Sequence, residues 1–156
     1  MASLLPPIPR LVFSVIEPIS LVAGFCGAVI DPAWFISEQV PQTEPVRVNE
    51  NSIVVAWQLG NLYLLMAFMG LAILHTTSEA KVVKGYLFAL WLGDIGHVGF
   101  STYALGLEKL MKPLEWNAVT SGNIGFTIFL FMMRSAYFLG LFGQDRAAVP
   151  TSKKRA

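Results

Sequence analysis

The stretch LWLGDIGHVGF, residues 90–100, places a carboxylic acid and an imidazole three residues apart in an otherwise apolar run. The surrounding apolar segment, 83–105, is long enough to cross about 30 Å of hydrocarbon, which takes roughly 20 helical residues. A charged group at mid-bilayer costs about 2.5–3.5 kcal/mol on insertion scales, so such groups normally face a protein interior. The segment therefore predicts a membrane helix on which Asp94 and His97 form a functional polar face.

Three further apolar segments of this length, 11–30, 53–74 and 118–143, flank the first. The connection 31–52 contains three prolines and several acids, which predicts an ordered loop outside the bilayer. The other two connections are short, so neighbouring helices should run antiparallel. We expect an all-α integral membrane protein, with a four-helix up-down bundle over 1–146 and a basic tail over 147–156.

Composition agrees with a membrane protein and excludes several other classes. Of the 156 residues, 54% are hydrophobic and 13% are charged. The formal net charge of +1 provides no basic surface for nucleic acid. The single cysteine, Cys26, has no partner for an internal disulfide or a cysteine metal site.

The distribution of Lys and Arg predicts the orientation. Seven of these residues flank the side of the two termini: Arg10, Lys81, Lys84, Arg146, Lys153, Lys154 and Arg155. Three flank the opposite side: Arg47, Lys109 and Lys112. The excess places both termini in the cytosol. There, Lys153-Lys154-Arg155-Ala156 matches the dilysine retrieval signal of endoplasmic reticulum membrane proteins, although a plain basic tail that faces lipid headgroups has the same composition.

Polar residues inside the spans recur at helical spacing. Asp94, His97 and Ser101 share one face of the third span. Gln58 and Asn61 share a face of the second. The remaining polar positions lie on the first span (Glu17, Ser20) and along the fourth (Thr120, Asn123, Thr127, Arg134, Tyr137). We therefore expect a polar cavity between the helices, with Asp94 near its centre.

Each polar group also has a structural interpretation. Arg134 and Glu17 would form a buried ion pair that fixes helix register. His97 would pin two helices by a hydrogen bond, and the amides of Gln58, Asn61 and Asn123 would join helices. Asp94, between Gly93 and Gly96, is harder to explain structurally, because these glycines open space beside the acid. The indoles of Trp57, Trp91 and Trp116 suit either membrane-interface anchors or pocket walls.

The sequence contains no motif for a cofactor, a phosphate or an activated serine. A metal site is disfavoured, because no His-x-x-His or Glu-x-x-His spacing is present. A carboxyl group in an apolar cavity tends to stay protonated, whereas one beside Arg134 would stay ionised. Such a pair can act as general acid and general base. Proton-driven reactions of a lipophilic substrate fit these parts: opening an epoxide, cyclising a polyene or shifting a double bond.

Several short motifs carry a resemblance that covers nearly the whole chain. They are Glu17-Pro18, Gln58-x-x-Asn61-Leu62-Tyr63-Leu64-Leu65, Asp94-x-x-His97, Trp116-Asn117, Gly122-Asn123-Ile124-Gly125-Phe126 and Arg134. With these the chain resembles a fungal family of small four-span membrane proteins of secondary-metabolite gene clusters. Some similar proteins are membrane epoxide hydrolases of polyene-pyrone pathways of the citreoviridin and aurovertin kind, which open polyene epoxides to cyclic ethers.

The resemblance implies that Glu17, Asp94, His97 and Arg134 are the functional positions. We expect Asp94 to protonate the epoxide oxygen and Glu17, tuned by Arg134, to act as base, or the two acids to exchange roles. Residues expected to orient substrate or water are Gln58, Asn61, Asn123, Tyr137, Trp57 and Trp116. No cofactor is expected. The expected partners are membrane lipids, a hydrophobic epoxidised polyene that enters from lipid and, in one arrangement, a second copy of the chain. The alternatives are a proton-initiated isomerase or cyclase of a sterol or terpenoid, and a non-catalytic scaffold for biosynthetic enzymes.

Overall fold

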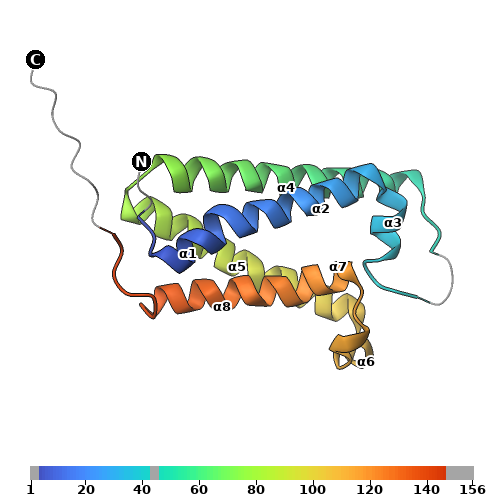
Figure 1. The fold of residues 1–156 in the computed structure, drawn as a ribbon. Helices are drawn as coiled ribbons and strands as arrows, with labels where there is room; N and C mark the ends of the chain where they lie inside the picture. Colours follow the sequence, from blue (N-terminus) through green and yellow to red (C-terminus); the bar gives the residue numbers. More distant parts are fainter. Residues whose placement is uncertain (1–3, 43–45, 147–156) are drawn as a thin grey trace, which may run out of the picture.

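The computed structural model describes residues 4–42 and 46–146, and these form helices with no strand among them (Figure 1). The predicted all-α class is confirmed. The first long helix runs through α1 (Pro7–Leu11), η1 (Val12–Ile16) and α2 (Glu17–Ile30), and the short α3 (Pro32–Ser37) follows it. The next two are α4 (Glu50–Thr76) and α5 (Ala80–Leu105). The last combines α7 (Ala118–Thr120), η3 (Ser121–Phe126) and α8 (Thr127–Phe138), after the short α6 (Leu107–Leu110) and η2 (Pro113–Glu115).

Local sequence signals account for the helix ends. Asn49 caps α4 in a reciprocal pair of hydrogen bonds with Ser52. α5 ends at Gly106, whose φ of 80° suits glycine. α8 ends at Phe138, five residues before the predicted boundary at 143. Gly140 and Gly143, at φ of 76° and 83°, turn the chain out of the helix there.

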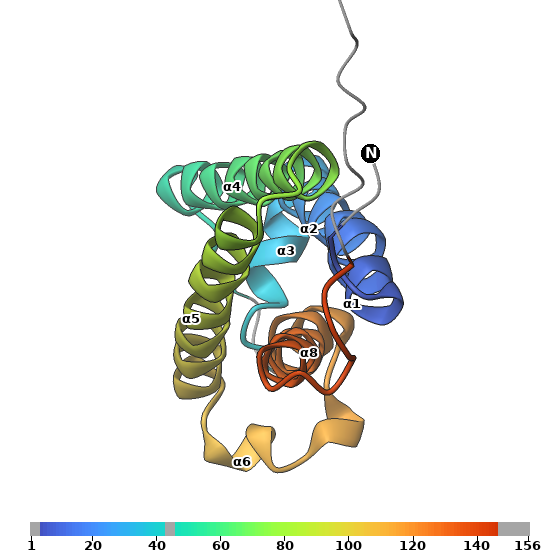
Figure 2. The ribbon, with the colours of Figure 1, turned by 90° about the vertical axis from the view of Figure 1, so that its left-hand side faces the viewer.

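The four long helices lie side by side as two closely packed pairs. α2 packs mainly on α4, and α5 packs mainly on α8 and η3 (Figure 2). Small residues allow the first pair to approach closely: a Cβ added to Gly60 of α4 would lie 3.0 Å from the Ala28 Cβ of α2. The second pair is joined by Trp91, whose indole donates a 2.9 Å hydrogen bond to Ser135 Oγ and stacks on the Phe131 ring.

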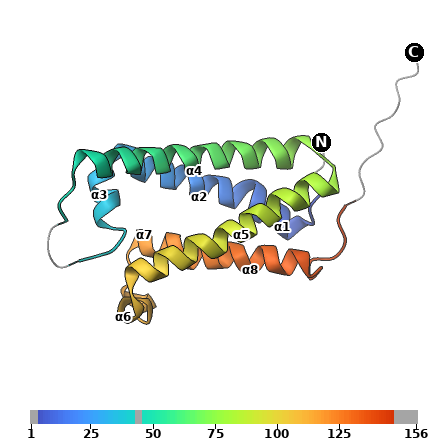
Figure 3. The same ribbon diagram turned by 180° about the vertical axis from the view of Figure 1, so that it is seen from behind.

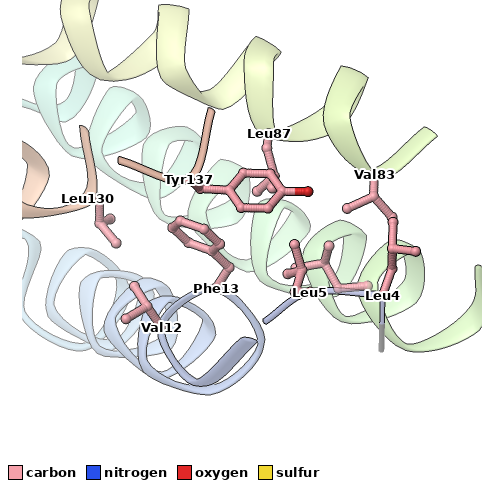
Figure 4. Close-up of a cluster of buried hydrophobic side chains, with 9 residues drawn as sticks. Leu4, Leu5, Val12, Phe13, Val83, Leu87, Leu130 and Tyr137 are labelled. Atoms are coloured by element: carbon pink, nitrogen blue, oxygen red, sulfur yellow. The ribbon is translucent and has the colours of Figure 1, made fainter. Parts of the chain in front are cut away.

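An apolar cluster joins the two pairs at the end where the described chain begins and ends. Phe13 lies next to Tyr137, and Leu5 and Leu87 complete the contact between elements that are distant in sequence (Figure 4). All four side chains are at most 6% exposed. The cluster also contains Leu4, Val12, Leu74, Val83 and Leu130. This end of the helix bundle is therefore closed.

The opposite end is covered by α3 and the turn after it. Phe35 of α3 packs against Ala28 of α2 and Ala56 of α4. The turn is tied to the last long helix, because Asn117 Nδ2 donates a 2.6 Å hydrogen bond to Glu38 Oε2. Figure 3 shows α3 across this end, beside the start of α7. The two pairs are thus joined at both ends and separated between them.

Two of the long helices, Pro7–Ile30 and Glu50–Thr76, are long and apolar enough to cross a membrane. This supports membrane association by length and composition. The basic tail predicted over 147–156, with its Lys153-Lys154-Arg155-Ala156 signal, lies outside the described residues.

Candidate functional site

A cavity of about 610 Å³ lies between the two helix pairs. Its walls come from α2, α3, α4, α5 and the α7–α8 helix, and most of the lining side chains are apolar. The polar lining includes two carboxyl groups, Glu17 and Asp94, together with His97 and Asn123. A volume of this size is typical of small-molecule sites, which are mainly apolar with a few convergent polar groups.

Arg134 joins the two carboxyl groups. Its Nη1 donates a 2.5 Å hydrogen bond to Asp94 Oδ2, and its Nη2 donates to Glu17 Oε1. Arg134 is fully buried, whereas Glu17 and Asp94 are 6% and 8% exposed. Three separate helices therefore contribute to one charged cluster, and the ion pair expected between Glu17 and Arg134 is present with Asp94 as a third member.

The guanidinium lies behind the carboxyl groups. Glu17 and Asp94 line the cavity, but Arg134 does not. Arg134 Cζ lies 5.3 Å from the centre of the Phe13 ring, within cation–π range. A molecule in the cavity would therefore meet carboxyl groups, while the cation holds them from the side of the apolar cluster.

Charge balance sets the chemistry of this cluster. Two carboxylates and one guanidinium carry a net charge of −1, and a net charge is costly in a low-dielectric interior. A single proton on either carboxyl makes the cluster neutral and leaves one acid beside one carboxylate. This combination can donate a proton and accept another.

A wide helical turn adjoins Glu17. The turn η1 has the five-residue hydrogen-bond spacing of a π-helix, with the Glu17 amide donating to the Val12 carbonyl. Pro18 follows directly and has no N–H for the carbonyl of Ser14, so an undistorted α-helix would be broken here. Such π turns occur frequently at functional sites.

A second wide turn, η3, contains Asn123. Asn123 Nδ2 donates a 2.8 Å hydrogen bond to Gln39 Oε1, and Gln39 Nε2 donates to the Phe35 carbonyl at 3.1 Å. His97, one turn along α5 from Asp94, lines the same part of the cavity. The imidazole and the amide therefore form a polar group separate from the charged cluster and near the α3 end.

Other cavity residues were not predicted. Tyr63 and Tyr86 line the wall, and Trp34 of α3 lies at one end. Gln39 was missed because it lies in a loop. It contacts the site through a hydrogen bond with Asn123, which lies 84 residues further along the chain. Tyr63 belongs to the motif that runs from Gln58 to Leu65, yet an aromatic residue in an apolar helix gives no sign of which side of the helix faces a cavity.

The predicted residues of α4 do not line the cavity. Gln58 and Asn61 are exposed on its outer face, and Trp57 is 49% exposed. The small residues Ala56 and Gly60 face α2 instead, and they lie about 100–160° around the helix from the two amides. All four helices were predicted to contribute polar groups to one interior. For α4 this is wrong as regards Gln58 and Asn61, and the helix contributes Tyr63 instead.

Two further predicted residues have structural contacts away from the cavity. Tyr137 is buried in the terminal cluster, and its hydroxyl donates a 2.9 Å hydrogen bond to Asp145 Oδ1. The Trp116 indole donates a 3.0 Å hydrogen bond to the Lys109 carbonyl. Neither side chain lines the cavity. Their contacts support the bundle ends and do not orient a molecule bound between the helix pairs.

No cluster of three or more His, Cys, Asp or Glu side chains suited to a metal ion occurs within residues 4–42 and 46–146. Acid–base chemistry at the charged cluster uses only Glu17, Asp94 and the groups that hold them.

Comparison with known proteins places the chain in a family but assigns no activity. Neither the curated proteins nor the solved structures contain a significant match. A family model described as a domain of unknown function, DUF7704, matches residues 2–144 and so covers the four long helices and the candidate site. The chain therefore belongs to the DUF7704 family.

Proposed function

We propose that the four long helices cross a membrane as an up-down bundle with both termini in the cytosol. The apolar character of Pro7–Ile30 and Glu50–Thr76 supports this, and each is long enough for 30 Å of hydrocarbon. The other two contain charged residues such as Asp94 and Arg134, which lower their mean hydropathy. At 1.5 Å per residue, the 118–138 helix is about 31 Å long, again sufficient to span.

We propose further that the protein is a cofactor-independent epoxide hydrolase or cyclase that acts on a hydrophobic polyene. One observation carries this proposal: two carboxyl groups from separate helices face one largely apolar cavity and share a single buried guanidinium. An apolar substrate would enter the cavity from lipid. The resemblance to membrane epoxide hydrolases of polyene-pyrone pathways makes an epoxidised polyene the preferred substrate class.

The reaction uses one proton that the cluster supplies and recovers. Asp94 in its acid form protonates the epoxide oxygen as the C–O bond breaks. Glu17, ionised beside Arg134, removes a proton from the attacking water or from an internal hydroxyl. The product is a diol or a cyclic ether, and the cluster keeps the same number of protons. Arg134 donates one hydrogen bond to each acid. The geometry therefore also allows the reverse assignment, with Glu17 as the acid and Asp94 as the base.

His97 and Asn123 are the orienting groups in this proposal. Both line the cavity within the polar region near α3, and both have side chains that hydrogen-bond to water or to a substrate hydroxyl. Gln58, Asn61, Trp57, Trp116 and Tyr137 have no part in it, because they do not line the cavity.

Co-expression with candidate polyketide pathway enzymes tests the proposal. Omission of this protein should cause an epoxidised polyene to accumulate, and microsomes that contain it should convert that epoxide. Oxygen-18 from labelled water should enter a diol product, whereas attack by an internal hydroxyl gives an unlabelled cyclic ether. An unlabelled product with a shifted double bond would instead identify the isomerase.

Loss of activity must be separated from loss of protein. A scaffold would leave the chemistry of its partner enzymes intact when Asp94→Asn is expressed at normal level. An enzyme of the proposed kind would lose turnover at that same level.

We also propose that the protein resides in the endoplasmic reticulum, on the basis of its C-terminal basic tail. A Lys153→Ala, Lys154→Ala variant should leave that compartment, as checked by microscopy of a tagged chain.

A further inference from the structure

A second, smaller pocket of about 210 Å³ adjoins the α3 end of the molecule. Its walls are the last turns of α5, the first turns of the α7–α8 helix and the turn that contains Gln39 and Val40. Unlike the main cavity, it brings several uncharged polar groups together in a small space. The volume has room for several water molecules at roughly 30 Å³ each.

The polar groups of this pocket can bind water. Thr120 is 3% exposed, lines the pocket, and its hydroxyl has no hydrogen-bond partner among the described residues. Ser101 of α5, Gln39 and Asn123 line the same pocket, beside the apolar residues Val40, Phe100, Ala104, Leu105 and Ile124. A buried water needs two to four polar partners, and this pocket supplies them. Burial of the unpartnered Thr120 hydroxyl would cost less free energy if a water molecule formed a hydrogen bond with it.

The position of Asn123 links the pocket to the main cavity. Asn123 lines both spaces, and Gln39 holds its amide in place. Ser101 lies four residues before the end of α5, about 6 Å from that end of the helix. The pocket therefore lies between the loop end of the bundle and the part of the cavity that His97 lines.

We propose that the small pocket is a water-binding vestibule that supplies the main cavity with water past Asn123. This inference rests on the proposed function for the use of the water, but the presence of the water can be tested without a substrate. The vestibule would let a reaction in a lipid-accessible cavity draw its second reactant from the aqueous side.

Cysteine accessibility in the full-length chain tests the vestibule. In a Cys26→Ser background, Ser101→Cys and Tyr103→Cys are treated with a charged methanethiosulfonate reagent in permeabilised microsomes. The reagent needs water and a thiolate. Tyr103 is nearer the helix end and is 89% exposed, so it is the matched control for depth. We expect Ser101→Cys to react at least tenfold faster, although it lies deeper. Equal or slower reaction at Ser101→Cys would overturn the vestibule.

Thr120 provides a second, independent readout. Thr120→Val removes the hydroxyl at nearly constant shape, and it should slow labelling of Ser101→Cys at least threefold. Thr120→Ser should restore the rate. Unchanged labelling in Thr120→Val would show that this hydroxyl binds no water in the pocket and would overturn its assigned role.

Use of the vestibule in catalysis has a separate measurement. With an epoxidised polyene and labelled water, Thr120→Val should lower the ratio of labelled diol to unlabelled cyclic ether. An unchanged ratio would overturn the supply route. If the epoxide is not converted at all while Ser101→Cys is still labelled rapidly, the proposed function fails and the water site stands.

Discussion

Removal of the Arg134 guanidinium tests the energetics of the charged cluster. Arg134→Met keeps a long apolar stem and deletes both charged hydrogen bonds. A hydrogen bond to a charged group contributes about 1.5–3 kcal/mol, so the loss of two predicts about 3–6 kcal/mol. This agrees with the roughly 3–5 kcal/mol lost when one partner of a buried ion pair is removed. Glu17 and Asp94 are only 6% and 8% exposed, so little bulk water is available to replace the cation.

The assay is reversible unfolding in mixed micelles, followed by loss of helical circular dichroism. The matched control is the triple variant Glu17→Gln, Asp94→Asn, Arg134→Met, which removes all three charges. It should recover most of the lost stability, because no unpaired charge remains buried. A loss below 1 kcal/mol for Arg134→Met alone would refute the argument. So would a triple variant that is no more stable than the single one.

Four other positions give independent expectations. Gly60→Val should destabilise the fold by about 1–3 kcal/mol, because a Cβ there already meets α2 side chains at 3.0 Å. Gly85→Ala, with open space around its Cβ position, should be neutral or should stabilise α5 by up to about 1 kcal/mol. Tyr137→Phe should cost about 0.5–1.5 kcal/mol through loss of its hydrogen bond to Asp145 and should leave turnover unchanged. Gly93→Leu should block substrate, because it fills space in the cavity wall where nothing lies within 4 Å of the added Cβ, and it should leave stability close to that of the parent.

Each of these expectations has a contradictory outcome. Thermal unfolding in detergent that ranks Gly60→Val with Gly85→Ala would contradict the close α2–α4 contact. A tenfold loss of turnover in well-folded Tyr137→Phe would show that the Tyr137 hydroxyl contributes to the reaction. Full turnover in Gly93→Leu would mean that substrate does not occupy the cavity between the helix pairs.

Helical periodicity predicted the parts of the site that follow regular helix geometry. Asp94 and His97 are three residues apart on the uninterrupted helix α5, and both line the cavity. The polar character of Glu17 and Arg134 in apolar segments required burial against partners, and the two do meet. Each of these inferences concerns a single helix. Residue spacing reliably shows which residues of one helix share a face.

The polar residues of α4 do not reveal which face of this helix points into the protein. Gln58 and Asn61 share a face, but spacing does not say whether that face turns inward. The better signal was the repeat of small residues, Ala56, Gly60 and Ala67, because close helix packing needs them. That repeat faces α2, which leaves the amides outside.

Two other features lay beyond sequence patterns. The turn η3 shifts the register between Asn123 and Arg134, so three-four spacing over the whole fourth segment was not a sound basis for Tyr137. Gln39 enters the site from a loop through a hydrogen bond to a distant helix. Such a contact depends on tertiary packing and leaves no local periodicity.

The rate of epoxide turnover in Asp94→Asn and Glu17→Gln microsomes tests the central claim most directly. Gln58→Leu is the matched control, because it alters a polar residue of a long apolar helix that is exposed on the outer face of α4 and does not line the cavity. At equal amounts of folded protein, each acid variant should lose 10²–10⁴ fold in rate, the usual contribution of a general acid or base. Gln58→Leu should stay within about twofold of the parent. Full turnover in both acid variants would contradict catalysis by the carboxyl groups that Arg134 holds.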